Sequence, residues 1–326
     1  MNILVTGAAG YIGSIVTEQL IKEGNFVVAL DNLKQGHREA IAPEAAFAQV
    51  DLGDLQRLDD VFYNYRVEAV IHLAADSLVE HSMNDPEGFF RNNVIYSMNL
   101  LSTMLKHGVY KLVFSSSASV YGEPGKMPIE ENDAQKPINP YGESKLMFEK
   151  ILHWYGHAYG VKSVSLRYFN AAGASERFGE DHNPETHLIP NVLKVALGQS
   201  NEVTIFGTDY PTEDGTCIRD YIHVLDISKA HTLSLKHLEK SKGGEAYNLG
   251  NGQGYSVLEV IGTARKVTNA QIRTSIHLRR PGDPAVLIAS SELARAQLGW
   301  QPEFPDLESI VGSAWRWQKS HPHGYS

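Results

Sequence analysis

Cysteine is almost absent from this chain. Cys217 is the single cysteine among 326 residues, so an intrachain disulfide and a zinc site built from thiolates are both excluded. A chain without disulfides suits a reducing compartment, and we expect a cytoplasmic location. The 14 histidines show no His-Glu-x-x-His or comparable spacing, so no metal is expected in the functional site.

Long apolar runs and basic runs are also missing. No apolar stretch reaches the roughly 20 residues that a membrane-spanning helix needs. The amino-terminal residues 1–6 lack the cationic and long apolar regions of a signal peptide, so none is expected. The net charge of −9 argues against nucleic acid and against an anionic membrane as partners. With 42% hydrophobic and 21% charged residues, the composition is that of an ordinary soluble globular protein.

A glycine-rich turn near the amino terminus joins two apolar segments. Residues 2–6 lead into Gly7-Ala-Ala-Gly10-Tyr11-Ile12-Gly13, then an amphipathic segment over 14–23, then a second apolar run over 26–30 that ends at Asp31. This order predicts a strand, a turn, a helix and a strand that bind a dinucleotide. The glycines let the backbone approach a pyrophosphate, and the helix amino terminus offers it N–H groups.

The acid after the second strand favours one cofactor. Asp31 stands 21 residues after Gly10, where a carboxylate accepts a hydrogen bond from a ribose 2′-hydroxyl and repels a 2′-phosphate. The sequence therefore favours NAD over NADP. A glycine turn of purely structural use is the alternative, and the flanking strands together with Asp31 argue against it.

Strands and helices alternate over the first half of the chain, which predicts an α/β fold with a Rossmann-type doubly wound parallel sheet. We expect residues 1–170 to form the NAD-binding domain, with some later segments returning to it, and residues 171–326 to form mainly a smaller α/β domain for the substrate. Further strands are expected at 46–50, 69–73, 111–115, 161–167, 203–206, 245–249 and 272–277. Helices are expected from about 54 and at 86–107, 140–159, 187–199, 225–239, 256–268, 290–298 and 306–319, with a polar loop over 171–186.

The stretch from Ser115 to Lys145 carries the predicted chemistry. Tyr141 and Lys145 are four residues apart and share one face of a helix that Asn139 caps and Pro140 begins. Ser115 and Ser117 follow a buried strand, at the sheet edge where ligands bind. A phenol has a pKa of about 10, so it acts as a base near neutrality only if nearby cations lower that pKa. Lowering the pKa by about three units corresponds to about 4 kcal/mol of interaction that favours the phenolate over the phenol. An aromatic residue beside a solvated lysine is the alternative interpretation.

Two other strand ends fit a cofactor. Asp51 and Leu52 follow the third strand, where the carboxylate is expected to reach an adenine amine or to cap the next helix. Ala74 follows the fourth strand and is small enough for a cofactor to lie close against it.

These motifs together resemble the extended short-chain dehydrogenase/reductase family. The motifs are the glycine turn, Asp31-Asn32, the serine-rich stretch 115–122, Tyr141-x-x-x-Lys145 and the stretch 167–170. Within that family, the stretches 206–223 and 279–283 are similar to those of the UDP-glucose 4-epimerases, and the resemblance spans nearly the whole chain.

The resemblance implies an isomerase of galactose metabolism that interconverts UDP-glucose and UDP-galactose with a retained NAD. Tyr141 takes the proton of the sugar 4-hydroxyl while hydride leaves carbon 4, Ser117 holds that hydroxyl, and Lys145 holds the ribose of the cofactor and lowers the tyrosine pKa. The implied NAD contacts are Gly7, Gly10, Tyr11, Ile12, Gly13, Asp31, Asn32, Asp51, Leu52, Ala74, Asn93, Ser115, Tyr141, Lys145, Tyr168 and Phe169. The implied UDP-sugar contacts are Ser117, Tyr141, Asn170, Leu188, Phe206, Arg219, Arg280 and Asp283.

Four positions depart from the family pattern or have an open role. Asp76 stands where some members have a lysine, and His187 replaces an asparagine beside the diphosphate. Leu287 occupies a position that governs pocket size and is smaller than a tyrosine, so activity on UDP-N-acetylhexosamines is a hypothesis. Cys217 lies near the diphosphate or serves packing alone.

Other functions remain as alternatives. A dehydratase is disfavoured because Ala118 and Ser119 replace the carboxylates that dehydration needs. A 4-epimerase of another UDP-sugar, a pentose or a uronic acid, would share these motifs. A non-catalytic NAD-binding sensor would have no need of the Tyr141, Lys145 and Ser117 set. The family expectation for assembly is a homodimer through the helices near 86–107 and 140–159.

Overall fold

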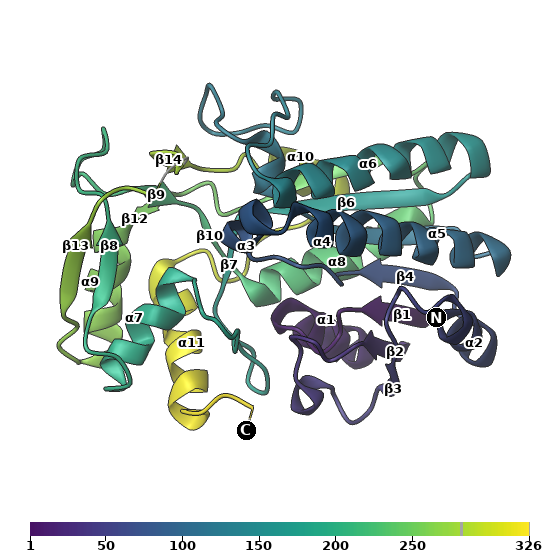
Figure 1. The fold of residues 1–326 in the computed structure, drawn as a ribbon, viewed down its shortest axis with the longest axis horizontal. Helices are drawn as coiled ribbons and strands as arrows, with labels where there is room; N and C mark the ends of the chain where they lie inside the picture. Colours follow the sequence, from purple (N-terminus) through teal and green to yellow (C-terminus); the bar gives the residue numbers. More distant parts are fainter. Residues whose placement is uncertain (281–282, 326) are drawn as a thin grey trace.

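Seven parallel strands form the central sheet of the protein (Figure 1). The structure is a computed structural model that describes residues 1–280 and 283–325. The strand order is β11-β6-β5-β4-β1-β2-β3, so the expected Rossmann-type doubly wound sheet is confirmed. The strands are β1 (Asn2–Thr6), β2 (Phe26–Asp31), β3 (Ala46–Gln49), β4 (Ala69–His72), β5 (Lys111–Ser117), β6 (Lys162–Tyr168) and β11 (Glu245–Leu249).

Helices cover both faces of this sheet, and alternate residues of each strand supply the two cores. Ile3 and Val5 of β1 are buried in one apolar cluster, and Leu4 is buried in the other. Each such side chain contributes about 1.5–3 kcal/mol on leaving water. Side chains of α1 (Tyr11–Lys22), α8 (Val224–Leu238) and α10 (Glu292–Leu298) complete the first cluster. Side chains of α2 (Leu55–Tyr65), α5 (Tyr96–Lys106) and α6 (Pro140–Tyr159) complete the second.

The order of the strands determines where a ligand can bind. β1 lies between β2 and β4, so the chain runs outward in opposite directions from this point of the sheet. The connections on the two sides of β1 therefore leave a crevice at the carboxyl ends of β1 and β4. The last strand, β11, pairs with β6, so the sheet includes a segment from beyond residue 170.

The expected single helix over 86–107 is wrong in its middle. The chain forms α3 (Val79–Asn84), α4 (Pro86–Phe90), a π-helical turn η2 (Arg91–Ile95) and then α5. Within that turn the Asn93 amide accepts a hydrogen bond from the backbone N–H of Asp76 at 2.8 Å and donates one to the Asp76 carbonyl at 2.9 Å. These bonds tie the wider turn to the segment after β4, and hydrophobic periodicity does not reveal them.

A smaller unit lies beside the carboxyl ends of the strands (Figure 1). Its core is an apolar cluster that includes Ile189, Val192, Ile205, Val260 and Ile310. Its elements are β7 (Asn170–Ala172), α7 (Leu188–Ala196), β8 (Val203–Phe206), β9 (Ile218–Arg219), β10 (Tyr221–His223), β12 (Tyr255–Ser256), α9 (Val257–Thr268), β13 (Thr274–His277), β14 (Val286–Leu287) and α11 (Leu307–Ser320). The segment expected as a loop over 171–186 therefore begins inside a short strand, β7, which pairs with β10.

The described residues also form two short 3-10 helices, η1 (Arg38–Ala40) and η3 (Ala118–Tyr121). Across the described ranges 1–280 and 283–325, we find no helix with the length and apolarity required to cross a bilayer.

Candidate active site

The start of α6 places the predicted tyrosine and lysine on one face. Asn139 caps the helix by accepting a hydrogen bond from the Gly142 backbone N–H at 2.8 Å, and Pro140 occupies the first helical position. Both features match the sequence prediction, because the cap satisfies a free N–H and the proline has none to lose. Tyr141 and Lys145 then follow one helical turn apart, beside the end of β5.

Lys145 is a buried cation at the floor of the site. Its Nζ donates a hydrogen bond to the Ser115 carbonyl oxygen at 2.9 Å and lies 5.7 Å from the centroid of the Tyr141 ring. Burial lowers the pKa of Lys145 to about 7, against an opposing effect of Glu149. The ammonium is therefore poised between its two protonation states near neutral pH.

Tyr141 and Ser117 form the other half of this group. Burial raises the pKa of the Tyr141 phenol, and a hydrogen bond with the Ser117 side chain acts in the opposite direction. Within the protein alone, burial is the larger effect. The lowering of the pKa that the sequence predicts therefore requires a cation in addition to the protein groups that act on Tyr141.

The three glycines of the turn are required for different reasons. Gly7 has a φ of +72°, and a Cβ there would lie 2.6 Å from the Ala74 backbone nitrogen. A Cβ on Gly13 would lie 2.0 Å from the Gly7 carbonyl oxygen, so α1 packs on this turn only without a side chain. A Cβ on Gly10 would have only the Gly7 carbonyl oxygen near it, at 3.4 Å. Gly10 therefore faces open space at the amino terminus of α1.

That open space fits a dinucleotide pyrophosphate. Gly10 is the residue before α1, and it makes no side-chain cap that would occupy the free N–H groups of the first turn. Such groups attract phosphate. Tyr11 begins α1, and its hydroxyl donates a hydrogen bond to the Gly173 carbonyl oxygen at 2.6 Å, which links the turn to the second unit.

Carboxylates lie at the ends of β2 and β3. Asp31 is buried and accepts hydrogen bonds from the backbone N–H groups of Ala9 at 2.9 Å and Leu33 at 2.8 Å, while burial raises its pKa. Asp51 accepts a hydrogen bond from the Asn32 side chain at 2.8 Å. The cap of α2 is Asp54 and not Asp51, so the Asp51 carboxylate lies free of that alternative role.

The second unit contributes cationic side chains. Arg219 donates to the Ile218 carbonyl oxygen at 2.7 Å and forms an ion pair with Asp283. The Arg280 guanidinium carbon lies 4.1 Å from the centroid of the Phe206 ring. Pro281 and Gly282, from the motif over 279–283, lie outside the described residues. The arginines can bind a diphosphate, and Phe206 offers an aromatic face for a base.

One cavity of about 1740 Å³ joins these groups. It is lined by all of the predicted site residues except Asn93, which is buried behind the wall and bonded to Asp76 and Ser144. Tyr168, whose hydroxyl is hydrogen bonded to the Ser115 hydroxyl, lines it together with Phe169, Asn170 and Leu188. The cavity is large enough for a dinucleotide and a sugar nucleotide together.

The positions with open roles are also placed. Asp76 lines the cavity, and burial raises the pKa of its carboxyl group against an opposing effect of the positive charge of Lys34, another lining residue. Cys217 is buried at the cavity wall, where burial raises its thiol pKa. Leu287 lies in β14 beside Arg219 and packs against the apolar cluster of Val120 and Ile129, away from the lining.

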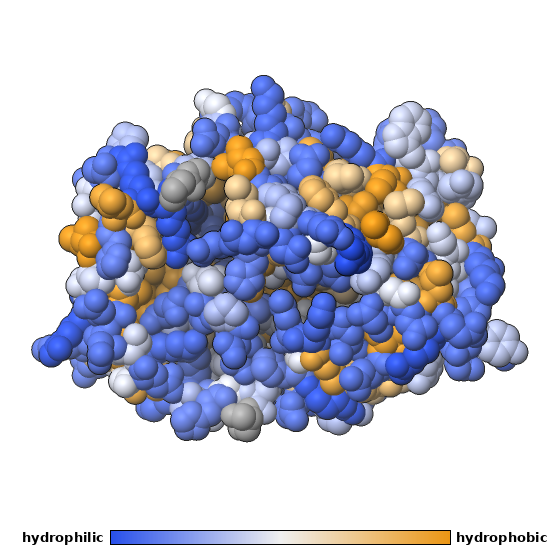
Figure 2. Space-filling model, in the orientation of Figure 1, coloured by the Kyte–Doolittle hydropathy of each residue, from blue (hydrophilic) through white to orange (hydrophobic). Residues whose placement is uncertain are grey.

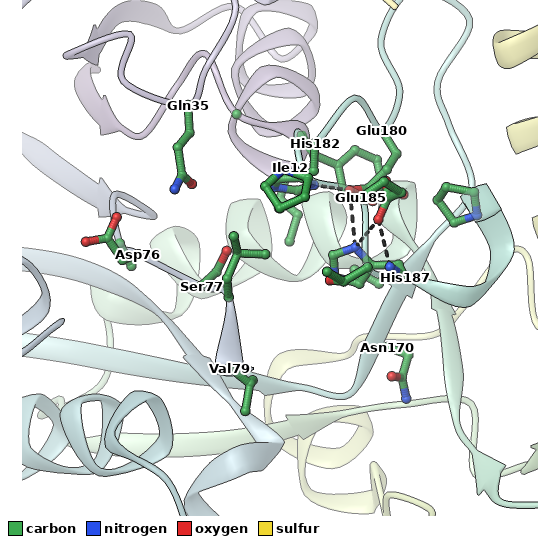
Figure 3. Close-up of a pocket in the computed structure, with 18 of the residues that line it drawn as sticks. Ile12, Gln35, Asp76, Ser77, Val79, Asn170, Glu180, His182, Glu185 and His187 are labelled. Atoms are coloured by element: carbon green, nitrogen blue, oxygen red, sulfur yellow. Dashed lines mark hydrogen bonds and ion pairs between the residues drawn. The ribbon is translucent and has the colours of Figure 1, made fainter. Parts of the chain in front are cut away.

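Four polar residues on one wall of the cavity form a group that the sequence patterns did not predict. Figure 3 shows Glu180, His182, Glu185 and His187 gathered at the cavity, across from Gln35 and Asp76. Their spacing is Glu-x-His-x-x-Glu-x-His, which differs from the His-Glu-x-x-His pattern of zinc enzymes. The first three residues lie in the segment predicted as a polar loop, so no pattern in the sequence singles the group out.

Comparisons with known proteins agree with this geometry. Residues 3–250 match the NAD dependent epimerase/dehydratase family. A UDP-glucose 4-epimerase of Halalkalibacterium halodurans is 54% identical over 328 residues, which cover 100% of this chain and 98% of that protein. A crystal structure of a UDP-glucose 4-epimerase superposes with a TM-score of 0.98 at 48% identity and covers 100% of both chains. The UDP-glucose 4-epimerase of Bifidobacterium longum, solved with NAD⁺ and UDP, superposes with a TM-score of 0.94 at 38% identity over 99% of this chain and 100% of that chain.

These matches confirm the resemblance that the motifs predicted, and they extend it over the full chain. The chain belongs to the NAD dependent epimerase/dehydratase family, and its full-length similarity places it with the UDP-glucose 4-epimerases.

Proposed function

We propose that this protein interconverts UDP-glucose and UDP-galactose by transient oxidation at carbon 4 of the sugar, with NAD retained between turnovers. The observation that carries the proposal is the meeting of Tyr141, Ser117 and Lys145 in the cavity that the glycine turn also lines. A bound NAD supplies the hydride acceptor and donor at carbon 4.

The side chains of the chain handle the proton. Tyr141 takes the proton of the sugar 4-hydroxyl and returns it to the 4-oxygen after the keto sugar has rotated in the cavity. Ser117, hydrogen bonded to Tyr141, orients that hydroxyl. Lys145 lies one helical turn away with a pKa of about 7, and its charge favours the phenolate. The residues proposed to hold NAD are those of the glycine turn with Asp31, Asn32, Asp51, Leu52 and Ala74.

The far end of the cavity anchors the nucleotide part of the substrate. Arg219 and Arg280 bind the diphosphate, Phe206 packs on the uracil, and Asp283 accepts from the ribose. Asn170 and Leu188 also line the cavity. Strong binding of UDP lets the keto sugar rotate within the cavity without dissociating, which 4-epimerisation requires.

The test uses purified protein with no added cofactor. The protein is incubated with UDP-galactose, UDP-glucose is assayed, and the absorbance of reduced nicotinamide is recorded. We expect UDP-glucose without net accumulation of NADH. Steady NADH accumulation would identify a net dehydrogenase. If neither UDP-glucose nor NADH forms after NAD is added back, the substrate is another UDP-sugar, such as a pentose or uronic acid form, or the protein is a non-catalytic sensor.

A variant pair separates catalysis from binding. Tyr141→Phe removes the proton-transfer group and is expected to lower kcat by about 10²–10⁴-fold while NAD stays bound. Tyr159→Phe changes an exposed tyrosine of the same helix, 55% accessible, and is expected to change nothing. Full turnover by Tyr141→Phe would overturn its role as the base and revive the sensor interpretation.

The proposed assembly is a homodimer through α5 and α6. Figure 2 shows a mostly hydrophilic face with an apolar patch over the region of these helices in Figure 1. The exposed large apolar side chains in this region include Ile95 at the end of η2, Met98 of α5, and Met147 and Trp154 of α6. Burying them against a second copy removes this apolar surface from water. The single cysteine supports the cytoplasm as the proposed location.

A further inference from the structure

Four side chains with metal-binding chemistry converge between β7 and α7. Glu180, His182, Glu185 and His187 each present one ligand atom, and these atoms all lie within 4.8 Å of one another. The catalytic proposal uses none of them. Among the described residues, this is the single place where three or more such groups meet.

The distances approach those of a tetrahedral shell. Zinc bonds to imidazole nitrogen and carboxylate oxygen at about 2.0–2.2 Å, which places neighbouring ligand atoms about 3.4 Å apart. The Nδ1 of His187 lies 2.8 Å from an oxygen of Glu185 and 3.6 Å from an oxygen of Glu180. The Nδ1 of His182 contacts that same Glu180 oxygen. Shifts of about 1 Å would bring all four atoms to zinc distance.

The two buried carboxylates of this group carry two negative charges that need to be balanced. The side chains of Glu180 and Glu185 are 8% and 3% exposed, and burying a carboxylate without a counter-charge costs several kcal/mol. Within the described part of the chain, the ion-pair partners of these carboxylates are His182 and His187. Either two imidazolium ions or one divalent cation must therefore balance them.

The two imidazoles crowd one carboxylate oxygen. The rings of His182 and His187 are 5.5 Å apart between centroids, and both Nδ1 atoms are directed at one oxygen of Glu180. Two positive rings in this position repel each other. A divalent cation between the four groups balances both carboxylates, leaves both imidazoles neutral and uses their lone pairs as ligands.

The surroundings hold this segment in place from several sides. The Asp181 carbonyl oxygen contacts His37 Nε2 at 2.8 Å, and the Asp181 carboxylate accepts from the Tyr325 backbone N–H at 3.0 Å. His187 is followed directly by Leu188, the first residue of α7. A metal here would fix a segment that already contacts the cofactor-binding unit and the carboxyl-terminal tail, at the wall of the cavity.

We infer that Glu180, His182, Glu185 and His187 form a structural site for one divalent transition metal of the zinc type. Two imidazoles and two carboxylates match the ligand preference of zinc, whereas magnesium and calcium prefer oxygen alone. The site fixes the segment 173–187 and takes no part in proton transfer.

The test begins with the metal content of the whole protein. The chain is purified without a polyhistidine tag and without chelators, and zinc is measured by plasma mass spectrometry. We expect about one zinc per chain. Protein treated with EDTA and dialysed is then titrated with Zn²⁺ in competition with a chromophoric chelator. We expect it to bind one equivalent of Zn²⁺ saturably. We also expect Zn²⁺ to restore any melting temperature that the EDTA treatment lowered. Protein that contains no zinc and shows no saturable binding overturns the inference.

Variants locate the site. His182→Gln and Glu185→Gln are expected to lower zinc content at least tenfold. His153→Gln, which removes an exposed histidine of α6, is the matched control and is expected to keep it. Circular dichroism verifies folding, and the titration of the unmodified chain decides the case if a variant fails to fold. Zinc retained in full by both variants would place the metal elsewhere and overturn the assignment.

Discussion

The ammonium of Lys145 is held 2.9 Å from the Ser115 carbonyl oxygen, which fixes it 5.7 Å from the centroid of the Tyr141 ring. The bond joins the last residues of β5 to the first turns of α6, so the two elements that carry the proposed chemistry are fixed relative to each other. This arrangement has a cost, because burial disfavours the charged form of the lysine.

Because of that cost, we expect Lys145→Met to raise the stability of the fold and to lower the activity. The pKa of Lys145 falls from an ordinary 10.5 to about 7 in the folded chain, so the unfolded chain binds more protons between these values. The stability of the wild type therefore rises with pH over this range. The free-energy cost of burying the Lys145 amine is largest at and below pH 7. We expect the variant to melt at a higher temperature than the wild type at pH 7 and to lose that advantage near pH 10.

The activity of the same variant should fall. Without a cation beside the phenol, we expect kcat to drop at least 100-fold. Thermal melts at pH 7 and pH 10, together with the epimerase assay, check both halves of the prediction. A variant that is both active and no more stable than the wild type at pH 7 would contradict it.

The glycine turn predicts a second contrast between neighbouring positions. Gly13→Ala forces a Cβ to within 2.0 Å of the Gly7 carbonyl oxygen, so the backbone must shift and the fold should lose several degrees of melting temperature. Gly10→Ala meets only an ordinary contact at 3.4 Å and should fold normally. Because its methyl group occupies the phosphate cradle, it should lose at least tenfold in NAD affinity. Calorimetry and NAD content after gel filtration distinguish the two. Equal losses of stability would show that Gly10 is also required for packing.

The sequence predicted those parts of the fold that depend on local patterns. The strand over 2–6 and the cap at Asn139 follow from apolar periodicity and from one side chain, and both agree with the structure. The reversal of strand order at β1 explains why residues 7–13, 115–117 and 141–145 meet at one edge of the sheet.

Features that depend on contacts between distant residues were not predictable in this way. The π turn at Asn93 is held by the backbone of Asp76, 17 residues away, which no helical periodicity records. The group at Glu180 and His187 becomes visible only when the segment folds back on itself. The raised pKa of Tyr141 arises from burial, which a residue pattern does not reveal.

The position of Leu287 predicts a substrate range. The family resemblance implies that a small residue at this position widens the pocket. The protein should therefore turn over UDP-N-acetylglucosamine as well as UDP-glucose, and Leu287→Tyr should lower the ratio of the two rates about tenfold. Parallel assays with both substrates measure that ratio. Because Leu287 lies in β14 and outside the cavity lining, any effect must be transmitted through the adjacent Arg219 strand. No turnover of the acetylated sugar by the wild type would end the idea.

Buried histidines predict a loss of stability in mild acid. His231 is fully buried in α8, with Nδ1 2.9 Å from the Ile227 carbonyl oxygen. Its Nε2 has no hydrogen-bond partner among the described residues, and burial lowers the pKa of the imidazole to about 4. The unfolded chain takes up this proton near pH 6.5, so stability present above pH 6.5 is lost as the pH falls towards 4, at up to about 1.4 kcal/mol per pH unit. His231→Leu removes this pH-dependent loss of stability. The urea midpoint of the variant should therefore fall less steeply between pH 6.5 and 4.5 than that of the wild type. His72, with a pKa of about 3, keeps part of the slope in the variant, so the dependence should flatten without vanishing. Identical slopes in the two proteins would show that His231 is not neutral in the folded state.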